Sequence, residues 1–169
     1  MNHTVSLEID GPAVGQPRQR HRIAGAPGAL FVQNYTPASH KVTGFKAEIE
    51  LRFKAARPPG WPSGDGWVYR LLVVEVRKAP KAAKKAAPAT PNGNKPDSDN
   101  VLKAVKDALK AAGAYPDDCR VYDERAVKVT AAAGRPGRVF IRLTAEPAGA
   151  VADEWQAVLN WDSQTVAVP

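Results

Sequence analysis

Apolar and polar residues along the first half of the chain follow patterns that predict two strands and a helix. Alternation over residues 4–10 predicts a β-strand. Apolar residues at helical spacing predict a helix over residues 43–56, and the Pro- and Gly-rich residues 57–66 predict a loop after it. The most continuous apolar run, residues 67–76, predicts a strand that is buried on both faces in the middle of a sheet.

Two intervening segments are less regular. Gly and Pro punctuate residues 11–28, which predicts a loop, and residues 29–32 are expected to form a short strand before a turn at residues 34–37. Residues 78–95 combine Ala, Pro and Lys without an apolar face. This composition predicts a mobile basic loop.

The second half of the chain predicts one helix and two strands. A helix is expected to begin near Asp97 or Ser98 and to end at Gly113, a residue typical of helix C-termini. Strands are expected over residues 120–130 and 138–144, and this last pair can form a hairpin, whereas the earlier strands need crossovers. The order predicts a single α+β domain with a small mixed sheet packed against two main helices.

Length, cysteine content and motifs narrow the class of protein. A chain of 169 residues with one cysteine is expected to form one domain without an internal disulfide or a Cys-based metal cluster. It has no apolar run near the roughly 20 residues of a membrane span and no signal-peptide pattern, so we expect a cytoplasmic protein without a membrane partner. Glycine-rich nucleotide-binding motifs are absent, so no nucleotide cofactor is expected.

Charge is distributed unevenly along the chain. The net charge is +7, but residues 146–169 hold four acidic and no basic residues, so residues 1–145 carry +11 (7 plus 4). Such a surplus of positive charge is typical of proteins that bind a polyanion. The alternative is that the charge only keeps the protein soluble. We expect a functional domain over residues 1–145 and an acidic extension after it. Five basic residues of the two loops are expected to contact phosphates: Arg18, Arg20, Lys81, Lys84 and Lys85.

Candidate chemistry lies in carboxylates around the second predicted helix. Asp97 and Asp99 stand at its start, and Asp117 and Asp118 follow its end. An Asp at a helix start usually caps the helix, but capping uses only one carboxylate. If folding brings these groups together, two carboxylates about 4 Å apart repel by roughly 4 kcal/mol at an effective dielectric of about 20, so a cation would be required. Ligands that are all oxygen point to Mg²⁺ or Mn²⁺ rather than zinc.

A lysine extends this candidate site. Lys103 lies four residues after Asp99, on the same face of the predicted helix. It would stabilise a phosphate oxygen as negative charge develops, and an ordinary Asp–Lys helix pair is the alternative. Asp107 continues the stripe, and its structural alternative is a pair with Lys103 or Lys110. A carboxylate metal site within a basic surface is typical of enzymes that cleave phosphodiesters.

These residues form part of a longer ordered pattern. It consists of Pro96, Asp97, Ser98, Asp99 and Asn100, then Lys103, then Asp107, Ala108 and Leu109, then Asp117 and Asp118, and finally Val121 and Lys128. The pattern resembles the RusA family of Holliday junction resolvases. The basic loop after the first strand, the turn at residues 34–37 and the Lys/Pro-rich loop are similar to those of phage-type members.

The resemblance covers about residues 4–145 and carries expectations for fold, activity and site. It implies a RusA-like homodimer that resolves four-way DNA junctions with Mg²⁺ by paired nicks. It also implies that Asp97, Asp99 and Asp118 hold the metal and that Lys103 is catalytic. Four further residues would support them: Asn100, Asp107, Asp117 and Lys128. The sequence departs from the pattern at Ser98, which is usually apolar, and at residues 114–116, which replace a common aromatic residue.

Two other classes of function are compatible with the same residues. A branched-DNA-binding protein without activity would keep the carboxylates as caps and bind junctions regardless of Mg²⁺. A metal-dependent phosphatase or phosphotransferase would use the Asp-x-Asp motif on small substrates. The second alternative leaves the +11 charge of residues 1–145 and the lysine-rich loop unexplained.

Overall fold

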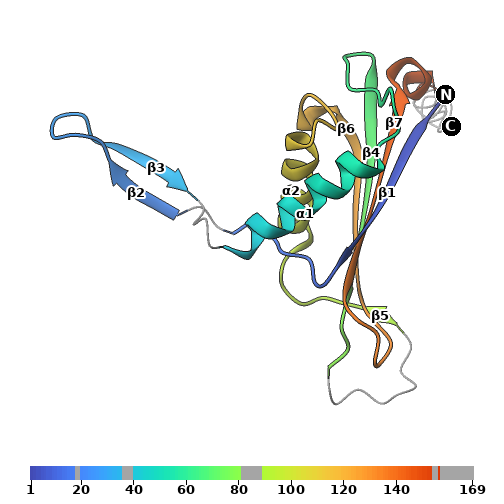
Figure 1. Ribbon diagram of the computed structural model, residues 1–169, viewed down its shortest axis with the longest axis horizontal. Coiled ribbons are helices and arrows are strands. Elements are labelled where there is room, and N and C mark those ends of the chain that lie inside the picture. The colour runs from blue at the N-terminus through green and yellow to red at the C-terminus, as the bar shows by residue number, and fades with distance from the viewer. Residues whose placement is uncertain (18–19, 36–39, 81–88, 154–155, 157–169) are drawn as a thin grey trace, which may run out of the picture.

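A five-stranded mixed sheet and two helices that cover one of its faces form the body of the protein (Figure 1). The computed structural model describes the chain except residues 18–19, 36–39, 81–88, 154–155 and 157–169. The strands of this sheet are β1 (His3–Asp10), β4 (Trp67–Arg77), β5 (Thr90–Pro91), β6 (Val121–Thr130) and β7 (Arg138–Pro147). The helices are α1 (Lys41–Ala56) and α2 (Ser98–Ala111), and a short 3₁₀ helix, η1 (Asp118–Arg120), precedes β6. The predicted α+β class with two main helices is confirmed.

The order of the strands differs from the one that the sequence suggests. It is β1-β7-β4-β6-β5, with β4 parallel to β6 and antiparallel to β7. The expected hairpin between the last two strands was wrong, because β4 lies between them. β4 is the most apolar strand, and in the centre of the sheet it pairs with both β6 and β7 over longer stretches than the other strands do. The helix α2 makes the crossover from β4 to the parallel strand β6.

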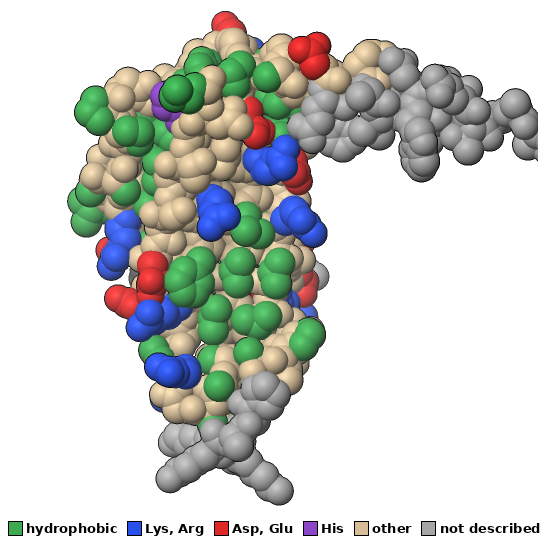
Figure 2. Space-filling model, turned by 90° about the vertical axis from the view of Figure 1, so that its right-hand side faces the viewer, with side chains coloured by type: hydrophobic (Ala, Val, Ile, Leu, Met, Phe, Trp, Pro, Cys, Tyr) green, Lys and Arg blue, Asp and Glu red, His purple; other side chains and the backbone are tan. Residues whose placement is uncertain are grey.

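Only one face of the central strand is buried. Tyr69, Leu71 and Val73 of β4 point toward the helices and are almost inaccessible, whereas Leu72 and Val74 on the other face are partly exposed. The expected burial of both faces was wrong for the single chain, because α1 and α2 lie on the same side of the sheet (Figure 1). Figure 2 looks onto the open face, where hydrophobic side chains gather beside Lys and Arg.

The core lies between the two helices and the covered face of the sheet. Ile49 and Phe53 of α1 are fully buried against it. The helix starts where the His40 side chain accepts a hydrogen bond from the Val42 amide at 3.1 Å. The second helix ends at Ala111, two residues before Gly113, which has a φ of +77° and so takes the left-handed conformation that glycine adopts without strain.

A second, two-stranded sheet projects from the body (Figure 1). It consists of β2 (Arg20–Ala24) and β3 (Phe31–Tyr35), which pair antiparallel. The expected loop over residues 11–28 therefore contains a strand, and the last two residues of β3 were expected in a turn. Sequence patterns missed this hairpin because Ile23, Phe31 and Val32 of the hairpin are exposed and face no core.

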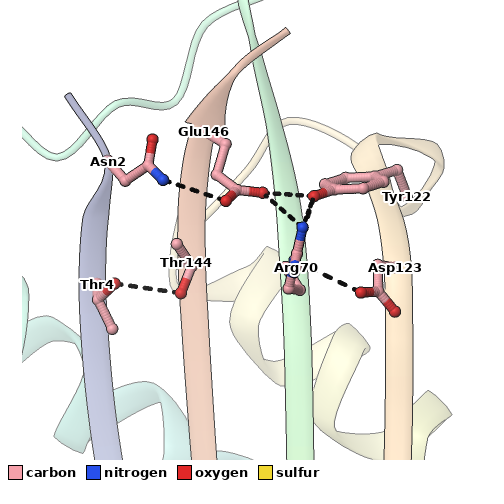
Figure 3. Close-up of polar contacts among 7 residues, drawn as sticks. All are labelled: Asn2, Thr4, Arg70, Tyr122, Asp123, Thr144 and Glu146. Carbon is pink, nitrogen blue, oxygen red and sulfur yellow. Dashed lines mark hydrogen bonds and ion pairs between the residues drawn. The ribbon is translucent and has the colours of Figure 1, made fainter. Parts of the chain in front are cut away.

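A polar network joins four strands at one end of the sheet (Figure 3). Glu146 of β7 accepts hydrogen bonds from the Asn2 amide at 3.2 Å and from the Tyr122 hydroxyl at 2.5 Å. Arg70 of β4 donates to the Tyr122 hydroxyl at 2.6 Å and lies 3.5 Å from Asp123. Burial and then the bond to Glu146 raise the pKa of Tyr122. These contacts tie the end of β7 to β4 and β6.

The basic segment 78–95 is only partly described. Residues 81–88 lie outside the described part of the chain, so the expected mobility of this segment is not tested there. Thr90 and Pro91 pair with β6 as a short edge strand, so this end of the segment belongs to the sheet. Among the helices that the structure describes, none is long and apolar enough to span a membrane.

Candidate metal site

The start of α2 presents two carboxylates that take no part in capping. Asp97 is the N-cap residue, and its carbonyl accepts from the Val101 amide at 3.3 Å, but its side chain makes no capping hydrogen bond. Asp99 lies in the first turn and is exposed. Within the described residues, neither carboxylate has a hydrogen-bond or ion-pair partner. The capping explanation for this pair of residues therefore does not hold, and both side chains are available to a cation.

Lys103 is also without a partner in the described part of the chain. It lies one turn after Asp99 on the exposed side of α2, yet the two side chains form no ion pair. The ordinary helix pair that would explain Lys103 structurally is therefore not made. Its ammonium group is free to meet an anion that approaches the start of the helix.

Side chains from two strands hold the backbone that leads into Asp97. Lys128 of β6 donates to the carbonyl of Asn94 at 2.6 Å and to that of Pro96 at 2.8 Å. Arg77 of β4 donates to the carbonyl of Lys95, which lies between them. Three successive carbonyl groups are thus bound by two cations. Lys128 was expected to support the site, and these contacts show which part of the backbone it binds.

The loop after β1 closes on the same turn from the other side. The Gln16 amide donates to the carbonyl of Asn100 at 2.9 Å. Gly15 packs so closely that a Cβ there would lie 2.9 Å from Cβ of Pro96 and 3.2 Å from Cβ of Asn100. Glycine is required by this close approach. The first turn of α2 is therefore fixed between this loop and the strands.

The adjacent carboxylates after α2 have different environments. Asp117 caps η1 by accepting from the Cys119 amide at 3.1 Å, and it accepts from Lys110 Nζ at 2.7 Å. The bond from Lys110, followed by the bond from the Cys119 amide, lowers the pKa of Asp117 to about 2. In contrast, Oδ1 of Asp118 is buried and has no hydrogen-bond partner among the described residues. A buried oxygen without a partner is costly, so Asp118 is suited to a cation.

Aromatic residues fix the turn that carries Asp118. The Trp61 indole donates to the carbonyl of Ala114 at 2.8 Å. The ring of Tyr115 is buried 5.3 Å from the ring of Tyr69. Burial, with a smaller contribution from the negative charge of Asp118, raises the pKa of Tyr115 well above its usual range. The carboxylate of Asp118 therefore lies beside a packed, uncharged ring.

The two groups of carboxylates lie at opposite ends of α2. A helix of 14 residues is about 21 Å long. Across the described residues, no three acidic, His or Cys side chains come close enough together to hold a metal ion. The structure thus places Asp97 and Asp99 together and Asp118 apart from them within one chain.

Two further expectations concern Asp107 and the basic loops. Asp107 pairs with Lys46 of α1 at 2.6 Å, and not with Lys103 or Lys110 as in its structural alternative. The reason is that Asp107 lies on the side of α2 that contacts α1. Four of the five residues expected to contact phosphates lie outside the described part of the chain: Arg18, Lys81, Lys84 and Lys85. The fifth, Arg20, is the first residue of β2, and its side chain is not described.

Sequence patterns missed Glu75 and Arg77. Glu75 is only 1 % exposed, and its Oε1 accepts from Arg77 Nε at 2.7 Å. The signal was present in the sequence, because Glu75 continues the alternation of Tyr69, Leu71 and Val73. A carboxylate at a core position of a strand is rare unless it is paired.

These features define a class of protein. Carboxylates without structural partners, a free ammonium and a basic chain are typical of metal-dependent enzymes that cleave phosphodiesters. A sequence model described as endodeoxyribonuclease RusA matches residues 10–144. The chain therefore belongs to the RusA family, endodeoxyribonucleases that hydrolyse phosphodiester bonds of Holliday junctions and generally need divalent metal ions. A comparison with curated proteins finds no match.

Proposed function

We propose that this protein resolves four-way DNA junctions by paired, symmetric nicks and that Mg²⁺ is its metal, with Mn²⁺ as a substitute. One observation carries the proposal. Within the described residues, the carboxylates of Asp97 and Asp99 and Oδ1 of Asp118 have no hydrogen-bond or ion-pair partner. In contrast, the nearby Asp107 and Asp117 are both ion-paired. The family pattern assigns the three carboxylates of Asp97, Asp99 and Asp118 to the metal.

The donor set fits a hard divalent cation. Asp97, Asp99 and Asp118 offer only carboxylate oxygens, which Mg²⁺ and Mn²⁺ prefer, and Oδ1 of Asp118 is a buried acceptor that a cation would satisfy. Such an ion supplies a water of lowered pKa and stabilises the oxygens of the displacement.

The chain's own residues orient the reaction. Lys103 binds the scissile phosphate on the side of Asp99 and stabilises its developing negative charge. Lys128 keeps the start of α2 in place through the carbonyls of Asn94 and Pro96. The Gln16 amide holds the carbonyl of Asn100 from the opposite side.

We propose further that the active form is a homodimer and that the metal ligands come from both chains. The carboxylates at the two ends of α2 are about 21 Å apart along the helix, so Asp97 and Asp99 would meet the partner subunit's Asp118. A two-fold axis makes two equal sites, which suits the near two-fold symmetry of a four-way junction. The open face of the sheet supports a protein partner, since Val127 and Phe140 are 43 % and 40 % exposed there.

Basic segments are proposed to contact the DNA. No acidic residue occurs between Gly11 and Ala47, and this stretch includes the hairpin that projects from the body (Figure 1). The segment 78–95 supplies a second run of lysines. Their phosphate contacts would position the junction, and its shape would provide selectivity. The acidic extension beyond β7 is proposed to lie outside this catalytic domain.

Cleavage of a labelled four-way junction beside a duplex made from the same arms tests the proposal. We expect nicks in the junction alone, with Mg²⁺ and not with EDTA. Junction binding without nicks in any divalent metal would instead favour a DNA-binding protein without activity. Failure to bind or cleave either DNA would favour an enzyme that acts on small phosphate substrates.

A further inference from the structure

Glu75 stands out among the described residues because it is the one buried side chain that carries a charge. It lies on the covered face of β4, beside Lys128 of β6 in the register of the two strands. Only one of its oxygens is bonded: Oε1 accepts from Arg77, and Oε2 has no partner in the described part of the chain. Burial of an ion pair costs desolvation, so such a pair is a weak source of stability. Its retention in the core therefore calls for another explanation.

Arg77 connects this buried carboxylate to the backbone before the metal site. Its Nε donates to Glu75 at 2.7 Å, and its Nη1 donates to the carbonyl of Lys95. A guanidinium group is planar and rigid, so fixing one nitrogen on Glu75 also fixes the direction of the others. The peptide of Lys95 is thereby oriented by a group that is itself anchored in the core.

Lys128 completes this arrangement. It binds the carbonyls on either side of Lys95, those of Asn94 and Pro96. The next residue is Asp97, and Asp99 follows in the first turn of α2. Both carboxylates are free of other side-chain bonds within the described residues, so their positions depend on the backbone that these strands hold.

We propose that Glu75 and Arg77 are positioning residues that orient the peptide of Lys95, and through it Asp97 and Asp99, toward the metal ion. The inference rests on the proposed function, since it assigns those two carboxylates to the metal. Residues behind a ligand commonly change metal affinity by about 10–100-fold when they are replaced. A displacement of about 1 Å can slow a reaction by about 100-fold.

The test compares Arg77→Met with Arg52→Met, which removes the same charge from an exposed ion pair with Glu48 on α1. Mn²⁺ affinity is measured by calorimetry on the protein without DNA, and the Mg²⁺ concentration for half-maximal cleavage is measured on a junction. We expect Arg77→Met to weaken both by about 10-fold or more, with unchanged junction binding in EDTA. Arg52→Met is expected to behave as the wild type.

Two conservative variants keep the test decisive if Arg77→Met folds poorly. Glu75→Gln keeps the volume, and Arg77→Lys keeps the charge but not the planar fork. Hydrogen exchange of the Val101 and Gln16 amides, which donate to the carbonyls of Asp97 and Asn100, should become faster in both, with no change in the sheet. Unchanged exchange and unchanged Mn²⁺ affinity in these variants would overturn the positioning role. A wild type that binds Mn²⁺ but never cleaves junctions would overturn the proposed function and leave the affinity comparison valid.

Discussion

Lys110 donates a hydrogen bond to Asp117 at 2.7 Å, and this contact distinguishes two adjacent carboxylates. Asp117 also caps η1, so both of its oxygens are bonded. Oδ1 of Asp118 is buried without a partner among the described residues. The same residue type, at consecutive positions, therefore has a structural role in one case and is available for a ligand in the other.

Replacement of Asp118 by Asn should abolish cleavage while junction binding in EDTA is retained. Loss of a metal ligand removes several kcal/mol of transition-state stabilisation, so we expect a decrease of about 1,000-fold in the cleavage rate. Asp117→Asn is the matched control, because it makes the same chemical change one residue earlier. Cleavage rates on a labelled junction measure both. Equal rates for the two variants would contradict the assignment of Asp118.

The Lys110–Asp117 contact predicts a titration. Removal of the cation in Lys110→Met should raise the pKa of Asp117 from about 2 toward the ordinary value near 4. The carboxyl carbon shift, followed by NMR in the metal-free protein, measures this pKa. We expect junction cleavage to persist in this variant. A pKa that stays near 2 would mean that the Cys119 amide, rather than Lys110, is the main cause.

Lys103 should act on the reaction more than on DNA affinity. We expect Lys103→Met to lower the single-turnover cleavage rate by about 100-fold or more, since one preorganised charge near the developing oxyanion is lost. Lys54→Met changes an exposed lysine on α1 and serves as the control. If Lys103→Met weakened junction binding by the same factor as it lowered the cleavage rate, Lys103 would be a general contact to DNA phosphates instead.

A shared metal site predicts complementation between subunits. Asp97→Asn and Asp118→Asn chains should each be inactive alone. If the ligands come from two chains, a mixed dimer of these variants has one intact site and one site that lacks both ligands. After the two variants are mixed and their subunits have exchanged, nicking of one strand of the junction should therefore be restored. Inactivity of a mixture whose exchange has been verified would show that each site belongs to a single chain.

The core predicts a stability difference along α1. Phe53 is fully buried, whereas Leu51, two residues earlier, is 65 % exposed. Phe53→Ala should lower the free energy of unfolding by about 3–5 kcal/mol, because it leaves a cavity in the core. Leu51→Ala should change it by less than about 0.5 kcal/mol. Urea denaturation measures both, and similar values would contradict this packing.

The sequence was informative where a local pattern determines the structure. The spacing of Phe45, Ile49 and Phe53 predicts α1, and the apolar run of β4 predicts the central strand. Strand order could not be predicted in this way, because it depends on which distant segments pair. The projecting hairpin was missed for the opposite reason, since it has no buried face that would leave a pattern.

The candidate site was predicted as a set of residues but not as a geometry. The spacing of Asp97, Asp99 and Lys103 along one helix follows from the sequence. The pairing of Asp107 with Lys46 does not, because it depends on how α1 packs against α2. The distance between Asp118 and the other two carboxylates likewise depends on the length of α2 and the direction of the crossover.

Cleavage of a supercoiled plasmid that extrudes a four-way cruciform tests the central claim most directly. Two nicks made at symmetric positions within one binding event convert the plasmid to a linear form, whereas single nicks give an open circle. We predict linear product with Mg²⁺ or Mn²⁺, cut at the cruciform, and none with EDTA. Open circles alone, or cutting that does not depend on the cruciform, would contradict the proposal of a resolvase with two paired sites.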